Sequence, residues 1–395
     1  MKARRAGRRR DAPSHGRAST AIVLLALAAG NCGAAGDGAP AQTQDETRVL
    51  LQNTWTAYTA RFVQPDGRVV DPKAGGITTS EGQAYAMLRA VWIEDRGAFD
   101  RTFAWAVNNL NRGVRADALW AWRWGAAPDG SFRVLDQAFA SDADEDAALA
   151  LILAARTWND EAYLRHARAA LADLWEHGTI VAGGRRYLLG GDTLCQGSTC
   201  RINPSYYAPY AYRIFAREDP AHDWLSLVET TYFLLGRNSG FTTTRLPSDW
   251  ILLDTATGEL RPGSETDSRY SYDAFRVHWR VALDAALYGE SRAHAYSRES
   301  LAWAADRFRQ QQRLPAIISS RGEAKADYEA PEMLAAIMPA LRDFAPDVAD
   351  AISQRLQASL SDGLWGDRES YYLQNWAWFG TALDKRHLVP FERVR

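Results

Sequence analysis

The chain has 395 residues, of which 47% are hydrophobic and 24% charged, and its formal net charge is -2. This is the composition of a globular protein that is long enough to bury a large core. A net charge near zero gives no electrostatic reason to expect nucleic acid or an anionic membrane surface as a partner. The 15 Trp and 16 Tyr, against 4 Met, instead favour surfaces that stack on a flat ligand.

The first residues have the pattern of a secretory signal peptide. An Arg-rich stretch (2–17) precedes the apolar run AIVLLALAAG (21–30) and a group of small residues. The run has about half of the roughly 20 residues that a bilayer span needs. We therefore predict a signal peptide over 1–35, a linker over 36–44, and a secreted or periplasmic protein. Lipid anchoring at Cys32 is the less favoured alternative, because Asn31 before the cysteine fits such a site poorly.

The remaining cysteines, Cys195 and Cys200, bracket the short loop CQGSTC. An oxidising compartment would pair them in a disulfide, whereas a reducing one would leave two loop thiols. No Cys/His quartet has the spacing of zinc ligands, and the acidic run 142–146 lacks the glycine and the distal glutamate of a calcium loop. We therefore expect no metal.

Hydrophobic periodicity predicts one mostly helical domain over 45–390, with short strands within 132–136, 185–189 and 249–254. The even-numbered helices begin with carboxylate, hydroxyl or aromatic groups, and the odd-numbered ones do not. This alternation predicts an all-α (α/α)6 barrel, in which inner helices bring their N-termini to one mouth and outer helices return. The expected helices are 45–62, 80–95, 97–111, 142–157, 159–176, 204–217, 222–236, 271–288, 292–311, 330–342, 345–360 and 370–385.

The second predicted helix begins with SEGQ (80–83). Ser80 followed by Gln83 is typical of a capping box, with Ser80 as the N-cap. Gly82 is a poor helix former, and we interpret it as leaving room for a sugar ring beside Glu81.

Four acidic residues near helix starts are candidates for chemistry: Glu81, Asp142, Asp144 and Asp273. Acids in a first turn also stabilise the helix dipole, by about 0.3–1 kcal/mol, without any further function. The dipole lowers a carboxyl pKa, so a general acid at Glu81 needs burial or a neighbouring charge, from Asp142 or Asp144, to raise its pKa. We expect Asp144 to begin an inward-facing stripe of its helix. Paired carboxylates and aromatic platforms are the components of glycoside hydrolysis.

Aromatic and basic residues complete this set. LWAWRWG (119–125) places Trp120, Trp122 and Trp124 on one side of an extended segment, where they serve either as sugar platforms or as core. Arg276 follows Asp273 by three residues on the predicted helix 271–288, so Arg276 could orient Asp273 and keep it ionised, as a general base requires.

The sequence resembles glycoside hydrolase family 8 in segments spread over nearly the whole mature chain. In chain order they are DGRVVD (66–71), TTSEGQAYAM (78–87), LWAWRWG (119–125), ASDADEDAALALILA (140–154), NPSYYAPYAYR (203–213), YDAFRVHWR (272–280) and YYLQNWAWFG (371–380). The resemblance implies a secreted (α/α)6-barrel enzyme that cleaves β-1,4 bonds with inversion. Members of the family act on cellulose, mixed-linkage glucan, chitosan or xylan, and some serve bacterial cellulose synthesis.

The resemblance also assigns roles. It implies that Glu81 is the general acid, that Asp273 is the general base holding the water, and that Asp142 binds and distorts the sugar. It further implies a subsite lined by Tyr206, Tyr272 and Arg276, and a sugar stacked on Trp122 or Trp124. Asp144 remains a further substrate-binding candidate. Ala86 and Ala147 depart from the family's common residues, Gly and Ile or Met, and both are packing changes.

We therefore expect a monomeric endo-β-1,4-glucanase that needs no cofactor and acts on a cellulose-like polysaccharide or oligosaccharide. Chitosanase and xylanase are alternatives on the same scaffold. A non-catalytic glycan-binding protein of exopolysaccharide assembly would keep the aromatic platforms but need not keep both Glu81 and Asp273. Inversion requires the two carboxyl groups to be about 6.5–9.5 Å apart, which leaves room for a water.

Overall fold

The computed structural model describes residues 41–394. Within this range, no helix is both long enough and apolar enough to cross a membrane. The predicted signal peptide (1–35) lies outside the described residues. The linker prediction (36–44) is wrong over its last four residues, because α1 already begins at Ala41. Gln44 in its first turn donates to the carbonyl oxygen of Lys385 (3.0 Å), which ties this turn to the end of α12.

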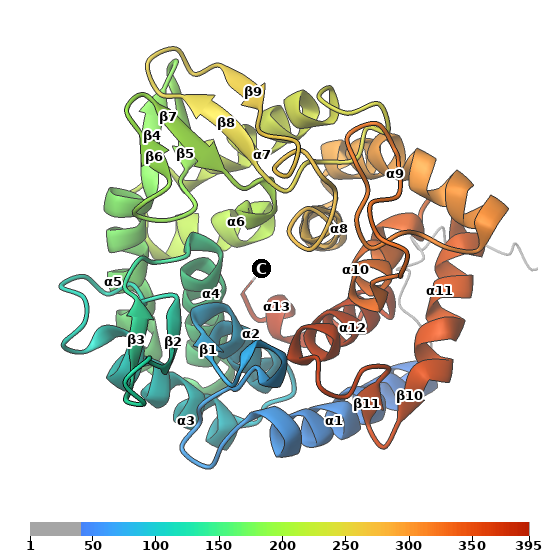
Figure 1. Cartoon of the computed structure of the whole chain (residues 1–395). Helices are drawn as coiled ribbons and strands as arrows, with labels where there is room; N and C mark the ends of the chain where they lie inside the picture. The colour runs from blue at the N-terminus through green and yellow to red at the C-terminus, as the bar shows by residue number, and fades with distance from the viewer. Residues whose placement is uncertain (1–40, 395) are drawn as a thin grey trace, which may run out of the picture. The chain divides into compact units, whose positions relative to one another are not determined.

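Twelve α-helices form two concentric rings, as the sequence predicts (Figure 1). The inner ring closes because α2, α4, α6, α8, α10 and α12 each contact the next, and α12 contacts α2. Each inner helix also contacts an outer partner, from α1, α3, α5, α7, α9 and α11. The inner helices are α2 Ser80–Trp92, α4 Ser141–Trp158, α6 Pro209–Glu218, α8 Arg276–Tyr288, α10 Pro331–Leu341 and α12 Tyr371–Asp384. The outer helices are α1 Ala41–Phe62, α3 Arg96–Ala106, α5 Glu161–Gly178, α7 Trp224–Ser239, α9 Ser291–Gln311 and α11 Pro346–Ser359.

Burial explains which helices lie inside. Nearly every residue of α2, α10 and α12 is buried, whereas α5 and α11 bury only one stripe. A helix that is buried on all sides belongs between other helices, and a helix with one apolar stripe belongs outside.

The strands lie in the connections between helices, and three of them match the predicted ones within two residues. One sheet has the order β1-β2-β3, and another has the order β6-β7-β8-β9. Two hairpins, β4-β5 and β10-β11, complete the set. The strands are β1 Thr78–Thr79, β2 Arg123–Ala126, β3 Phe132–Asp136, β4 Thr179–Ala182, β5 Arg185–Leu188, β6 Cys195–Gln196, β7 Thr199–Ile202, β8 Ile251–Asp254, β9 Leu260–Pro262, β10 Leu360–Ser361 and β11 Leu364–Trp365. A disulfide joins Cys195 and Cys200 across the β6-β7 hairpin.

Two inner helices begin later than predicted. Pro204 opens a 3-10 turn that ends at Tyr206, and α6 starts again at Pro209, because a proline lacks the N–H that would continue the earlier turn. The helix predicted from 271 begins at Arg276, because Asp249 accepts the backbone N–H groups of residues 271 and 274 and holds them in a turn.

A thirteenth helix, α13 (Val389–Glu392), closes the end of the barrel opposite to the mouth. It contacts α2 and α4. The ring of Phe391 packs edge-on against Trp92, the last residue of α2, at 4.9 Å between centroids, and against Tyr210 at 6.3 Å. The interior of the inner ring is therefore filled from this end.

Close contact between α10 and α12 gives a first prediction. A Cβ at Gly380 would lie 2.1 Å from the carbonyl oxygen of Ala335. We expect Gly380→Ala to lower the free energy of unfolding by roughly 1–3 kcal/mol, measured by urea denaturation, because two backbones must separate. The matched control is Gly236→Ala on the outer helix α7, where a Cβ meets nothing within 4 Å. That change should stabilise the protein by up to about 1 kcal/mol. A Gly380→Ala variant as stable as the control would contradict this packing.

Candidate active site

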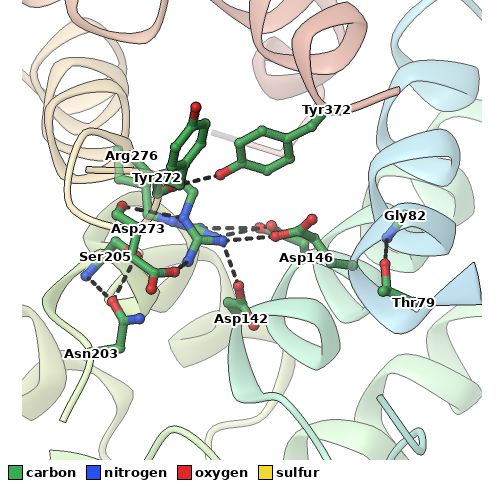
Figure 2. Close-up of polar contacts among 12 residues, drawn as sticks. Thr79, Gly82, Asp142, Asp146, Asn203, Ser205, Tyr272, Asp273, Arg276 and Tyr372 are labelled. Atoms are coloured by element: carbon green, nitrogen blue, oxygen red, sulfur yellow. Dashed lines mark hydrogen bonds and ion pairs between the residues drawn. The ribbon is translucent and has the colours of Figure 1, made fainter. Parts of the chain in front are cut away.

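A single arginine binds the three acidic side chains of the candidate site. Arg276, the first residue of α8, is 2% exposed. Its Nη1 donates to Oε2 of Glu81 (2.9 Å) and to Oδ2 of Asp142 (2.8 Å), and its Nη2 donates to Oδ1 of Asp273 (2.6 Å). Figure 2 shows Asp142 and Asp273 reaching this guanidinium from different elements. Three carboxylates that are far apart in sequence thus share one positive charge.

The barrel explains why these residues meet. Glu81 and Asp142 are the second residues of α2 and α4, and Asp273 lies in the turn just before α8. Because inner helices are parallel, their N-terminal ends come together at the mouth. Tyr371, the first residue of α12, also belongs to this cluster, because its hydroxyl donates to Oε1 of Glu81 (2.9 Å).

The environment of Glu81 suits a general acid. Burial raises the pKa of Glu81 to about 7, although Arg276 acts in the opposite direction. The negative charge of Asp142 raises this pKa further, as predicted for a neighbouring carboxylate. Asp273 adds a smaller effect in the same direction. The side chain is still 21% exposed. Glu81 can therefore carry a proton near neutral pH and present it to a ligand.

Asp273 is the most open of the three carboxylates, with a side chain that is 32% exposed, against 4% for Asp142. Its Oδ2 accepts a hydrogen bond from the indole Nε1 of Trp250 (3.0 Å). Each oxygen of Asp273 thus has one fixed donor, because Arg276 holds the other. An ionised, oriented and accessible carboxylate is what a general base requires.

The separation of Glu81 and Asp273 has an upper limit. Their oxygens lie 2.9 and 2.6 Å from two nitrogens of one planar guanidinium. Those nitrogens are about 2.3 Å apart, so the two oxygens are at most about 8 Å apart. This limit lies inside the window of about 6.5–9.5 Å for inversion. A separation within that window stays a prediction.

Tyr206 and Tyr272 lie beside this cluster. The guanidinium carbon of Arg276 is 5.2 Å from the centre of the Tyr206 ring. Tyr272 precedes Asp273 and is 37% exposed, and its carbonyl oxygen accepts from the hydroxyl of Tyr372 (2.7 Å; Figure 2).

The three tryptophans of LWAWRWG do not line one surface, because only Trp124 belongs to a strand. Trp120 is buried against Phe103. Trp124 contacts the rings of Trp105 and Phe132 and the guanidinium of Arg68. Trp122 is half-buried, its carbonyl oxygen accepts from Ser80 N at the start of α2, and its ring has no ring-to-ring contact among residues 41–394. The Trp122 ring is thus less covered by other rings than the Trp124 ring, although the guanidinium carbon of Arg123 lies 5.7 Å from its centre.

Two predictions about the start of α2 are wrong. Thr79, not Ser80, is the N-cap, since its hydroxyl accepts from Gly82 N (3.0 Å; Figure 2). Gln83 does not reach back to the cap, because its Oε1 accepts from Val69 N (2.5 Å). The space beside Gly82 is filled by protein: a Cβ there would lie 3.4 Å from the ring of Tyr371. Gly82 therefore leaves no room for a sugar ring beside Glu81.

Comparison with known proteins agrees with this geometry. The model of the family described as glycosyl hydrolases family 8 matches residues 43–359. The chain belongs to glycosyl hydrolase family 8. An endoglucanase of Cellulomonas uda is 34% identical over 232 residues, which are 58% of this chain and 63% of the relative. This family 8 chain thus spans about three-fifths of the length of the curated relatives that it matches.

Solved structures also resemble this family 8 chain. An endo-1,4-D-glucanase from Vibrio fischeri has a TM-score of 0.72 at 26% identity, and the match covers 83% of this chain and 93% of that one. The family 8 endoglucanase Cel10 from Klebsiella pneumoniae has a TM-score of 0.69 at 29% identity, with 85% and 99% covered.

The structure does not bring Asp144 to the cluster of this family 8 protein. Asp144 lines a separate cavity of about 240 Å³ between α3, α4 and α5, together with Trp120 and His166. Its Oδ1 accepts from Trp120 N (3.0 Å). The inward face of α4 instead carries Asp142 and Asp146, and Asp146 pairs with Arg280 of α8 (3.0 and 3.1 Å; Figure 2). The predicted inward stripe from Asp144 is therefore wrong.

Sequence reasoning missed Trp250 and Asp249 as parts of the site, and gave Tyr371 no role. The segment DWILLD was interpreted only as a strand, and nothing local to it indicates a contact with Asp273. For Tyr371 a signal existed, because the twelfth helix begins with ESYYLQNW. Within residues 41–394, no group of three or more His, Cys, Asp or Glu side chains could hold a metal ion.

The raised pKa of Glu81 predicts that the free energy of unfolding depends on pH. Between about pH 4.5, its ordinary pKa, and about pH 7, the folded state binds more protons than the unfolded chain. The free energy of unfolding therefore falls as pH rises through this window. Glu81→Gln removes this cost, so the variant should gain about 3 kcal/mol over wild type between pH 4 and pH 8, measured by urea denaturation. A difference that stays constant across this range would contradict the raised pKa.

Asp142 and Asp144 form a matched pair for a test of position. Asp142→Asn removes a charge from Arg276 and should lower kcat/KM by about a hundredfold in a reducing-sugar assay. Asp144→Asn should keep activity close to wild type, because Asp144 lines the separate cavity between α3, α4 and α5 and its Oδ1 accepts from Trp120 N rather than from Arg276. Equal losses in both variants would place Asp144 in the site after all.

Proposed function

We propose that this protein is an inverting endo-β-1,4-glucanase that hydrolyses internal bonds of a cellulose-like polysaccharide. The proposal rests on Glu81 and Asp273, which both bind Arg276. The pKa of the Glu81 carboxyl is raised to about 7, and the accessible carboxylate of Asp273 is held by two donors. Inverting hydrolysis needs one acid and one base of this kind. The relatives named endoglucanase support the choice of a β-1,4-glucan.

In this proposal Glu81 donates its proton to the glycosidic oxygen as the bond to the anomeric carbon breaks. Asp273 accepts a proton from the water that attacks the opposite face of that carbon, so one new C–O bond replaces the broken one. In this step Glu81 becomes charged and Asp273 becomes neutral, and proton exchange with solvent restores both before the next turnover; Arg276 contacts both carboxyl groups. Asp142, almost fully buried on the same guanidinium, stays in place to bind the sugar ring at the cleavage point.

Two further proposals concern the setting of the enzyme. We propose that it is exported, which the pattern of residues 2–30 supports, and the disulfide Cys195–Cys200 is compatible with an oxidising compartment. We also propose that it acts as a monomer.

The deciding experiment compares wild type with Glu81→Gln and Asp273→Asn on carboxymethyl-cellulose, lichenan, chitosan and xylan. We expect wild type to cleave the glucans, and each variant to lose at least about a hundredfold in kcat. Proton NMR of the first product formed should show the α-anomer. Cleavage of chitosan or xylan alone would change the substrate class, and a β-anomer would overturn inversion. Binding of a polymer without any cleavage by wild type would favour a glycan-binding protein.

A further inference from the structure

Asp273 does not belong to a helix, so its position depends on what holds the turn 271–275. Asp249 holds it from both sides: Oδ1 accepts from Ser271 N (3.0 Å) and Ala274 N (2.8 Å), and Oδ2 accepts from the hydroxyl of Ser271. These residues flank Asp273 in the chain. The carboxylate of Asp249 therefore fixes the backbone from which Asp273 projects.

The next residue, Trp250, fixes the Asp273 side chain itself. Its indole Nε1 donates to Oδ2 (3.0 Å), opposite to the Arg276 contact on Oδ1. An indole N–H is donor only and carries no charge, so it orients a carboxylate without supplying a competing proton acceptor. The two donors restrict rotation of the carboxylate and leave lone pairs on both oxygens for water.

Trp250 is itself held in place. The guanidinium carbon of Arg201 lies 4.6 Å from the ring centre, and Tyr206 packs edge-on at 5.7 Å. Trp250 N donates to the carbonyl oxygen of Asp267 (2.9 Å), and β8 begins at the next residue. Strand β8 pairs with β7, whose hairpin with β6 carries the disulfide Cys195–Cys200. A packed sheet thus anchors the ring.

We propose that Trp250 is a positioning residue of the reaction, which sets the orientation of the Asp273 carboxylate. This inference rests on the proposed function for Asp273 as general base. The charged and titratable groups around Asp273 are Arg276, Asp249, Tyr206 and Tyr372, with Glu81 and Asp142 on the far side of the guanidinium and Arg201 across the Trp250 ring.

The test is Trp250→Phe, which keeps an aromatic ring and deletes the N–H. We expect kcat to fall roughly tenfold or more with little change in KM, because a hydrogen bond to a charged group is lost. The acid limb of the pH profile of kcat should move to higher pH, because the carboxylate becomes easier to protonate.

The matched control is Trp303→Phe in α9. Trp303 is also half-buried and also lies under an arginine, with Arg307 5.2 Å from its ring centre, and it has no contact with Asp273. The kcat of Trp303→Phe and its pH profile should match those of wild type. If Trp250→Phe raised KM with an unchanged kcat and acid limb, Trp250 would be a sugar platform, and the positioning role would be overturned.

A second measurement does not depend on activity. The ¹H–¹⁵N signal of the Trp250 indole, assigned by its loss in Trp250→Phe, should shift in Asp273→Asn relative to wild type, because the charged acceptor of its N–H is lost. If wild type cleaves no polymer but this shift is present, the proposed function fails while the hydrogen bond stands. If the polymer is cleaved but the signal is the same in wild type and Asp273→Asn, the positioning role is overturned while the proposed function stands.

Discussion

One buried guanidinium determines the rest of the site. Arg276 contacts Glu81, Asp142 and Asp273, and so connects α2, α4 and the turn before α8. Buried ion pairs add little net stability, because desolvation of the charges offsets their attraction. Removing one partner leaves a buried charge without compensation, which is costly. The cluster therefore acts less as a source of stability than as a constraint: the inner helices can pack only in a register that brings all three carboxylates to Arg276.

The same cluster separates the roles of the carboxyl groups. One positive charge faces three acids in a poorly solvated place, and full ionisation would leave an excess of two negative charges there. Burial raises the pKa of Glu81 to about 7, while the more exposed Asp273 has donors on both oxygens. The different roles proposed for Glu81 and Asp273 thus follow from depth in the barrel and from hydrogen bonds, since the two side chains have the same functional group.

Sequence predicted the barrel and most of this cluster, because both depend on helix starts. Periodicity locates the inner helices, and parallel inner helices must bring their first turns together, which places Glu81, Asp142 and Asp273 near each other. Periodicity does not say which face of a helix is inside. Asp142 and Asp144 lie about 200° apart around α4, so only one can face the axis; the inward stripe was predicted from Asp144, whereas the axis side carries Asp142. Trp250 is a tertiary partner of Asp273 from a different segment, and its own neighbours carry no sign of that contact.

The helix α13 at the closed end has a consequence for how a polymer can be used. Below Arg276 lie Arg280 with Asp146 and Tyr210, and below these Phe391 of α13, all of them buried. The polysaccharide proposed above as the substrate consequently has no path along the axis and cannot be threaded from its end. It must instead lie across the mouth, and the products must leave from the same end of the barrel. In the proposed function, chain length then sets no limit on access, and a bond in the middle of a long polymer is as reachable as one near its terminus.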